Sequence, residues 1–308
     1  MKEIFYIGVF PGFIFSLIAG AVLSWFDRKV TAWVQFRKGP PFLQPFYDLG
    51  KLMNKETILP RDGGKVTFLV SPVLALCAAV ASSVMIFSPA LLLHTGFSGD
   101  ILVIIYLLAI PSIAYMVGAA ASANPLAIIG ASREMKLMLS YELAFLLILA
   151  TVAYKSGMTI RIADILSYQS AHGALIGSFS GVLLFIAALL CIQAKLGLVP
   201  FDVSEAETEI THGIFIEYSG LVYFVVKLAR YVMLYTLSSL LVILFLGGFH
   251  WQGTETLWSV LKLFLVVLLL TLIRNTNPRV RLDQSMRFFF IWVNLGVLAA
   301  FALSLFRL

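Results

Sequence analysis

Long apolar runs recur along this chain, and each has about the length that a helix needs to cross a lipid bilayer. A helix rises about 1.5 Å per residue and the hydrocarbon core is about 30 Å thick, so roughly 20 apolar residues suffice. Only 12% of the 308 residues are charged, whereas a soluble domain has roughly 25%. We therefore predict an all-α polytopic membrane protein with about eight transmembrane helices in a single membrane domain, residues 1–308. The predicted spans are 4–25, 66–93, 101–121, 137–154, 173–194, 217–247, 257–274 and 287–306.

The first apolar run has a competing interpretation, because Lys2 before an apolar stretch is also typical of a signal peptide. The run is long, and no clear cleavage site precedes the charged segment that follows it. We therefore predict that it is a retained span.

Lys and Arg residues are distributed unevenly between the predicted loops. Of the 22, fifteen fall in the odd-numbered loops and four in the even-numbered loops and the two termini. Basic residues accumulate in cytoplasmic loops, so we predict a multi-pass protein of the cell inner (cytoplasmic) membrane with both termini outside. The net charge of +6 is then a topology signal that can also contact anionic lipid. It does not indicate nucleic-acid binding.

The first predicted cytoplasmic loop contains an amphipathic segment. Apolar residues recur at helical spacing over 42–55, while Gln44, Asp48 and Lys51 take the other side. This pattern predicts a helix that lies in the membrane interface. Two roles stay open for it: a lipid anchor alone, or a docking floor for a peripheral subunit.

The fifth loop is strongly acidic. Closely packed carboxylates repel one another, which favours a shared proton, and a proton pathway needs such groups. A solvated acidic loop is the alternative. The five carboxylates are Asp202, Glu205, Glu207, Glu209 and Glu217.

Ionisable residues also occur in or beside the predicted spans, where they are costly and usually functional. Glu142 lies a few residues into the fourth span, and Glu134 lies two helical turns earlier, just before it. Lys227 and Arg230 lie three residues apart on one face of the sixth span. We expect a buried carboxylate such as Glu142 or Glu217 to pair with Lys227.

The chain has few residues that could hold a redox centre. Cys77 and Cys191 lie in separate apolar runs, and the four histidines are scattered. Iron–sulfur and zinc sites need closely spaced sets of such ligands. We predict no catalytic residue, no metal and no cofactor bound by this chain itself.

Motifs in three successive cytoplasmic loops resemble the H-subunit family of complex I, which includes the membrane subunits of energy-converting nickel–iron hydrogenases, formate hydrogenlyase and related complexes. The resemblance extends over the whole chain. Its motifs are Asp27-Arg28-Lys29 with Gln35-Phe36-Arg37-Lys38-Gly39-Pro40, Leu43-Gln44-Pro45, Ile129-Gly130-Ala131-Ser132-Arg133-Glu134, Ser140-Tyr141-Glu142, Pro200-Phe201-Asp202, Glu205-Ala206-Glu207 and Glu217-Tyr218-Ser219-Gly220.

The resemblance implies a non-redox membrane anchor that links electron transfer in a peripheral arm to proton or sodium movement. The acidic loop and the carboxylates of the spans would carry the ion. Arg28, Lys29, Arg37 and Lys38 would dock a peripheral iron–sulfur subunit. Other implied partners are a catalytic large subunit and antiporter-like membrane subunits. Iron–sulfur clusters and, in hydrogenase members, a nickel–iron centre would lie in those partners.

Two features point to a branch of the family. Only Pro41 and Phe42 separate Gly39-Pro40 from Leu43-Gln44, and this short form resembles the hydrogenase branch, which is ferredoxin- or formate-driven. The sequence Gly130-Ala131-Ser132-Arg133-Glu134 is also similar to hydrogenase-type members. Arg230 stands where complex I members often carry Glu, so the family's role for that position is not transferred directly. The alternatives are the quinone-site H-type subunit of a respiratory complex I, a subunit of a sulfur-reducing relative and, more remotely, a stand-alone ion transporter.

Overall fold

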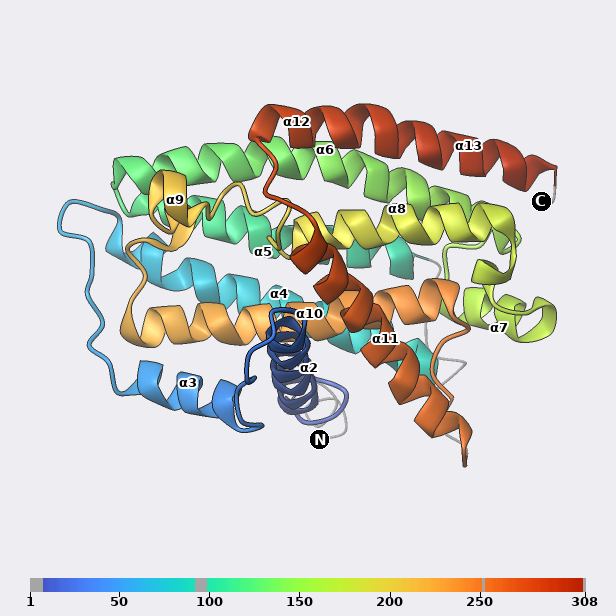
Figure 1. The fold of residues 1–308 in the computed structure, drawn as a ribbon, viewed down its shortest axis with the longest axis horizontal. Coiled ribbons are helices and arrows are strands. Elements are labelled where there is room, and N and C mark those ends of the chain that lie inside the picture. Colours follow the sequence, from blue (N-terminus) through green and yellow to red (C-terminus); the bar gives the residue numbers. More distant parts are fainter. Residues whose placement is uncertain (1–7, 92–98, 251–252, 307–308) are drawn as a thin grey trace.

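The computed structural model describes residues 8–91, 99–250 and 253–306, and within these ranges the regular structure is entirely helical (Figure 1). The α-helices are α2 (Phe13–Val34), α3 (Gln44–Met53), α4 (Lys65–Leu91), α5 (Asp100–Ala121), α6 (Pro125–Lys155), α7 (Ile162–His172), α8 (Phe179–Lys195), α9 (Glu207–Ile210), α10 (Gly220–Phe245), α11 (Glu255–Thr276), α12 (Leu282–Arg287) and α13 (Asn294–Leu305).

Six helical segments of the described chain are long and apolar enough to cross a membrane. They are α4, α5, α6, α10, α11 and the continuous stretch Leu282–Leu305, in which a π-helical segment joins α12 to α13. The helices of two other predicted spans, α8 and α2, are not among these six. The 17 residues of α8 make it a shorter apolar helix, and α2 carries Asp27, Arg28 and Lys29 in its C-terminal half. The all-helical membrane architecture is confirmed, and the outside location of the termini stays a prediction.

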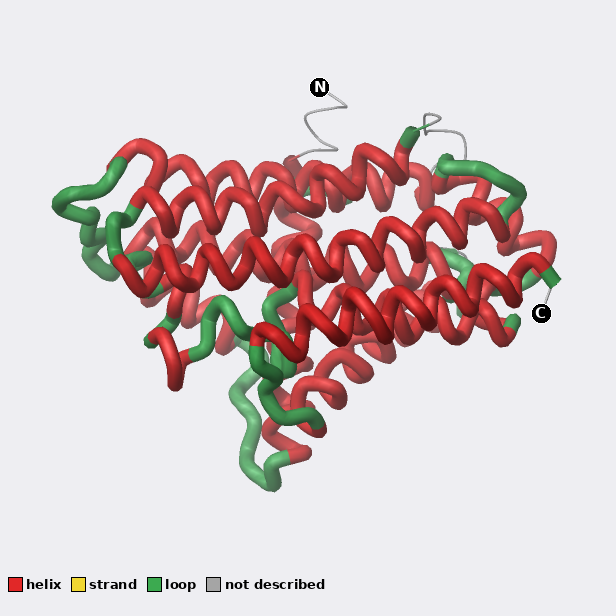
Figure 2. Tube along the Cα trace, turned by 90° about the horizontal axis from the view of Figure 1, so that it is seen from above, coloured by secondary structure: helices red, strands yellow, loops and turns green. Residues whose placement is uncertain are grey.

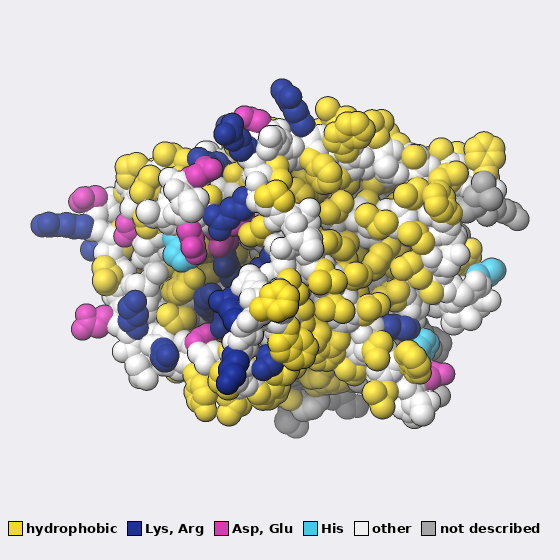
Figure 3. Space-filling view, viewed as in Figure 1, with side chains coloured by type: hydrophobic (Ala, Val, Ile, Leu, Met, Phe, Trp, Pro, Cys, Tyr) yellow, Lys and Arg dark blue, Asp and Glu magenta, His cyan; other side chains and the backbone are white. Residues whose placement is uncertain are grey.

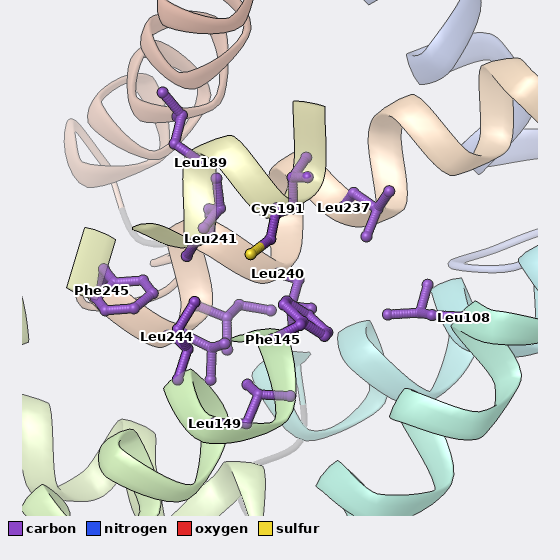
Figure 4. Close-up of a cluster of buried hydrophobic side chains, with 14 of the residues drawn as sticks. Leu108, Phe145, Leu149, Leu189, Cys191, Leu237, Leu240, Leu241, Leu244 and Phe245 are labelled. Carbon is purple, nitrogen blue, oxygen red and sulfur yellow. The ribbon is translucent and has the colours of Figure 1, made fainter. Parts of the chain in front are cut away.

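Helix α10 forms the centre of the bundle. In its apolar segment 89% of the residues are buried, against 33% for α11 and for Leu282–Leu305. It packs against α4 and α2 and more lightly against α11 and α8. Figure 4 illustrates the resulting core, where Phe145 and Cys191 meet Leu240, Leu241 and other apolar side chains.

The helices do not run parallel. In Figure 1 most of them lie near the horizontal, whereas α2 is seen almost end-on and α11 crosses the bundle diagonally. Figure 2 gives the perpendicular view, in which the steep tilt of these two segments relative to the rest is visible. Crossing at this angle brings the N-terminal half of α2, with Leu17 and Ala21, beside the N-terminal half of α10.

Helix α6 begins twelve residues before the predicted span 137–154, at Pro125. The Asn124 side chain accepts a hydrogen bond from the Leu126 N–H (2.9 Å) and so caps the helix, and Pro occupies the first turn. The predicted start was wrong because Arg133, Glu134 and Lys136 interrupt the hydropathy without interrupting the helix. Glu134 is consequently a buried helical residue, 8% exposed.

Three other helix boundaries also differ from the predicted spans. The first helix begins at Phe13 and continues to Val34 rather than ending near residue 25, and residues 4–7 of that prediction lie outside the described part. The predicted span 173–194 begins at Phe179, after Gly173 ends α7 with a positive φ. The span 217–247 begins at Gly220, which also has a positive φ of 52°.

The interfacial helix predicted over 42–55 is present as α3. Its Leu49 is buried against Ala21 of α2 and against Leu228 and Tyr231 of α10, while Met53 is exposed. Packing on two bundle helices fixes α3 to the membrane domain. Both predicted roles, lipid anchor and docking floor, stay predictions.

Helix α7 was not predicted, and it holds the C-terminal end of α10. The Gln169 amide nitrogen donates to the carbonyl oxygens of Ile243 (2.9 Å) and Leu244 (3.2 Å), and its oxygen accepts from the Gly247 N–H (2.9 Å). Carbonyl groups at a helix end need such partners when no water reaches them.

Replacing Gln169 by Leu should therefore destabilise the protein by about 2 kcal/mol, because buried backbone groups lose their partners. Thermal unfolding of the detergent-purified protein measures the loss. The exposed Ser170→Ala change in the same helix is the control and should stay within about 0.5 kcal/mol of the parent. Equal stability of the two variants would contradict the capping role.

Candidate functional site

Charged side chains gather on one part of the molecule. In Figure 3 they lie over α3, α9 and the loop between α8 and α10, whereas the opposite half of this face is mostly hydrophobic. A cavity of about 390 Å³ opens among them. The C-terminal ends of α2, α5, α8 and α11 and the N-terminal parts of α6 and α10 meet around it. Its ionisable lining residues are Asp27, Arg28, Glu134, Lys195, Asp202, Glu205, Glu207, His212, Lys227, Arg230, Arg274 and Arg279.

Ion pairs between distant segments build the cavity wall. Arg274 Nη1 of α11 lies 2.6 Å from Asp27 Oδ2 of α2. The Arg279 guanidinium lies 2.8 Å from Asp202 Oδ2 at the start of the acidic loop. Glu205 accepts a hydrogen bond from the guanidinium of Arg230, which also lies over the Phe215 ring. These pairs cancel most of the charge that the cavity would otherwise have to solvate.

Burial dominates the protonation behaviour of Asp202. It raises the pKa of this carboxyl despite the nearby Arg279, and the like charges of Glu205 and Glu207 act in the same direction. The acidic loop therefore contains a carboxyl that holds a proton more readily than usual.

The pKa of Asp48 in α3 is shifted in the opposite direction. Its partial burial is outweighed by hydrogen bonds from Arg28 (2.7 Å) and Gln44 (2.8 Å), so its pKa is lowered. The ionised carboxylate ties α3 to α2.

Glu134 occupies the inner wall of the cavity. The hydroxyls of Ser204 and Ser112 face its carboxyl, and the Ser112 Oγ lies 3.4 Å from the Tyr141 hydroxyl. A chain of hydroxyl groups thus leads from the cavity into the bundle. Hydroxyls can both donate and accept protons, so such a chain can pass one along.

Glu142, the residue after Tyr141 in α6, pairs with Lys195, and its side chain is 15% exposed. The Lys195 Nζ is 2.8 Å from Oε2 and 3.2 Å from Oε1 of Glu142. The Lys195 side chain is 2% exposed and lies over the rings of Tyr141 and Phe145. Glu142 is therefore partnered by a residue that the sequence had indicated only as a topology marker.

Lys227 has neither of the expected partners. Glu142 pairs with Lys195, and Glu217 accepts a hydrogen bond from Asn124 (2.5 Å). No ion pair of Lys227 occurs in the part of the chain that the structure describes. Its ammonium lies 5.4 Å from the centroid of the Tyr223 ring and lines the cavity. The predicted pairing was wrong because both carboxylates are engaged elsewhere.

The predicted ion-pathway residues separate into two groups. Asp202, Glu205, Glu207 and Glu134, with Lys227 and Arg230, come together around the cavity. The others lie outside it: Glu209 pairs with Arg133 at the surface (2.5 Å), Glu217 lies beside Asn124, and Glu142 lies behind Lys195.

The four predicted docking residues also separate. Arg28 lines the cavity and is paired with Asp48. Lys29, Arg37 and Lys38 line a shallow surface groove with Trp33 and the fully exposed Phe36. The groove offers both cationic and aromatic contacts to a partner.

Sequence reasoning missed several cavity residues. Asp27 and Arg274 were noted as motif and loop residues, but their pairing joins positions 247 residues apart. Ser112 lies in an apolar run and gave no signal, and its neighbour Tyr141, outside the cavity, was noted only as part of the Ser140-Tyr141-Glu142 motif. The one available clue was Lys195, a basic residue directly before the acidic loop.

Nothing among the described residues forms a metal site. They contain no group of three or more His, Cys, Asp or Glu side chains that could hold an ion. Cys77 is exposed and Cys191 is buried, and both are free thiols.

The described helices and this cavity define a polytopic α-helical membrane protein with a charged cavity at one end of its bundle. A family model described as NADH dehydrogenase matches residues 8–305. The chain belongs to this family, and the resemblance to the H-type membrane subunits of complex I is confirmed.

Known relatives agree with that assignment. The H-type subunit of the NADH-quinone oxidoreductase of Bordetella petrii is 33% identical over 299 residues, covering 88% of this chain and 82% of the relative. The corresponding subunit of Paramagnetospirillum magneticum is 35% identical over 288 residues, with the same coverage. A chain in the structure of the membrane-bound sulfane sulfur reductase, an archaeal respiratory membrane complex, superposes with a TM-score of 0.84 at 25% identity, covering 95% of this chain and 96% of that one.

Proposed function

We propose that this chain is the ion-coupling membrane anchor of a multisubunit, complex I-like oxidoreductase and performs no redox chemistry of its own. Its place as a membrane subunit of a complex I-like assembly follows from its family. The coupling role is the part proposed. Electron transfer in a peripheral arm would change the charge near the cavity. This change would drive a proton or a sodium ion through the chain.

One observation carries this proposal: a route of titratable and hydroxyl groups runs from an open cavity into the bundle. It starts at the acidic loop, reaches Glu134 and continues through Ser112 to Tyr141. The Tyr141 ring lies 5.7 Å from the ammonium of Lys195, which pairs with Glu142. Buried ionisable groups in a membrane domain are costly unless they serve transport or coupling.

The hydrogenase branch, ferredoxin- or formate-driven, is the type of complex that we propose first. The short segment between Gly39-Pro40 and Leu43-Gln44 supports it, and so does the Gly130–Glu134 motif, which is similar to hydrogenase-type members. The likeness to a chain of a sulfane sulfur reductase favours a sulfur-reducing relative as the second candidate. A quinone-site subunit is the third, favoured by the names of the curated relatives.

The proposed partners follow from the surfaces. Lys29, Arg37, Lys38 and the exposed aromatic residues beside them would contact the peripheral iron–sulfur subunit, which with the catalytic large subunit would hold the iron–sulfur clusters and any nickel–iron centre. Antiporter-like membrane subunits and lipid would cover the apolar flanks of a protein placed in the cell inner (cytoplasmic) membrane.

Purification of the tagged chain in mild detergent tests the assembly and its type. We expect it to be recovered with soluble redox subunits. Nickel together with iron and without quinone would place it in the hydrogenase branch, iron alone in the sulfur-reducing branch, and bound quinone in respiratory complex I. A chain that is recovered alone and still moves ions would contradict the proposal.

Exchanging a carboxylate of the route for its amide tests the ion path. Glu142→Gln and Glu207→Gln should each lower ion transport at least about tenfold, because an amide cannot carry the proton. Transport into sealed vesicles by the reconstituted complex is the readout. Asp62→Asn, which alters an exposed first-loop carboxylate, is the matched control and should transport like the parent. Unchanged transport in both test variants would refute the path.

A further inference from the structure

Lys195 lies in the cavity wall, whereas Glu142 lies outside the cavity and its side chain is 15% exposed. The cavity lining includes Lys195 and Glu134, and Glu142 is not part of it. The Lys195 ammonium bridges the gap, since it contacts both carboxylate oxygens of Glu142 from the last turn of α8. A proton that enters from the cavity side therefore meets Lys195 before it can reach Glu142.

The surroundings make this lysine dependent on its partner. The side chain is almost fully buried between the rings of Tyr141 and Phe145. A buried ammonium needs a carboxylate, and a buried carboxylate left without a cation takes up a proton instead. Lys195 and Glu142 therefore balance each other's charge.

Helix α6, which carries Glu142, has a second carboxylate on its cavity side. Glu134 precedes Glu142 by eight residues of α6, a rise of about 12 Å, and Tyr141 and Ser112 connect the two regions. Glu134 has no ion-pair partner among the described residues. It is therefore free to attract a cation from across the cavity wall, and a lysine arm of four methylene groups can turn toward it.

We propose that Lys195 is a positioning residue that acts as a gate between the cavity and Glu142. In the closed position, which the structure contains, the ammonium holds Glu142 ionised. In the open position it turns into the cavity toward Glu134, and Glu142 accepts a proton. The proposal rests on the proposed function, because the gate gives the ion route its direction.

The proposed proton transfer needs no electron donor or acceptor in this chain. One proton leaves the water of the cavity, passes the hydroxyls of Ser112 and Tyr141, and binds a carboxylate oxygen of Glu142. Lys195 keeps its own three protons and only changes the carboxylate that it faces. When the ammonium returns, it favours the ionised form and expels the proton.

Infrared spectroscopy of the purified native complex tests the closed position, because a protonated carboxylic acid has its own C=O stretching band. Lys195→Met should produce such a band, and the double variant Lys195→Met/Glu142→Gln should lack it. Lys195→Arg keeps a cation beside Glu142 and should resemble the parent. The Lys195→Arg variant thus distinguishes an effect of the lost charge from a packing defect. Variants are compared only when all subunits of the complex co-purify. Absence of the band in Lys195→Met would overturn the proposal.

Difference spectra between reduced and oxidised complex test the movement. The parent should gain a carboxylic-acid band on reduction, and Glu142→Gln should lose it. Glu134→Gln should lose it too, since the ammonium then has no second carboxylate to face. The proposed movement of Lys195 would be contradicted if the parent gained no carboxylic-acid band on reduction. It would also be contradicted if Glu134→Gln showed the same band as the parent. A complex that shows these Lys195-dependent bands yet transports no ions would refute the proposed function separately.

Discussion

Replacing Gly20 by alanine should break the contact between α2 and α10. A Cβ atom at this position would overlap the main-chain carbonyl of Tyr231, which belongs to the central helix and cannot move aside. Small residues let membrane helices approach this closely. Overpacking usually costs about 1–3 kcal/mol, and we expect the upper end or more here because the obstacle is backbone. Thermal unfolding of the detergent-purified protein measures the effect.

Gly296→Ala is the matched control. This glycine is also helical, but an added Cβ would meet nothing within 4 Å. The change should be neutral or stabilise the helix by about 0.5–1 kcal/mol. Indistinguishable melting of the Gly20 and Gly296 variants would mean that the close approach of α2 and α10 contributes nothing to stability.

Breaking the Lys195–Glu142 pair should have the second large effect. Lys195→Met leaves the partly buried Glu142 carboxylate without its cation, and removal of one partner of a buried pair costs about 3–5 kcal/mol. The Glu142 side chain is 15% exposed, so we expect the lower end, about 3 kcal/mol. The variant should unfold at a clearly lower temperature than the parent complex.

A double-mutant cycle isolates the pair. Lys195→Met combined with Glu142→Gln removes both charges, and it should recover most of the lost stability because replacing a buried pair as a whole is often neutral. If the two single changes simply add in the double variant, Lys195 and Glu142 are not coupled, and the ion route loses its inner end.

The helices could largely be predicted from the sequence, because hydropathy alone dictates which segments can lie in lipid. The errors occur where charges are satisfied by distant residues. Helix α2 continues past residue 25 since Asp27 meets Arg274 and Arg28 meets Asp48. Helix α6 begins early since Glu134 is sheltered by Ser112 and Ser204. Neither partnership has a local pattern that periodicity could detect.

The candidate site was predicted in part for the same reason. The acidic loop is contiguous in sequence, so Asp202, Glu205 and Glu207 were identified as a cluster. The bond between Lys195 and Glu142 joins α8 to α6, and only the packing of these two helices determines it. Lys227 was paired incorrectly because the sequence cannot tell which carboxylates other residues already occupy.

The most direct test of the central claim is ion movement by the intact complex in sealed vesicles, measured together with electron transfer. The account predicts that electron transfer by the parent builds a proton or sodium gradient, and that Glu142→Gln moves far fewer ions per electron. Electron transfer that proceeds at full rate in the parent without any gradient would contradict it.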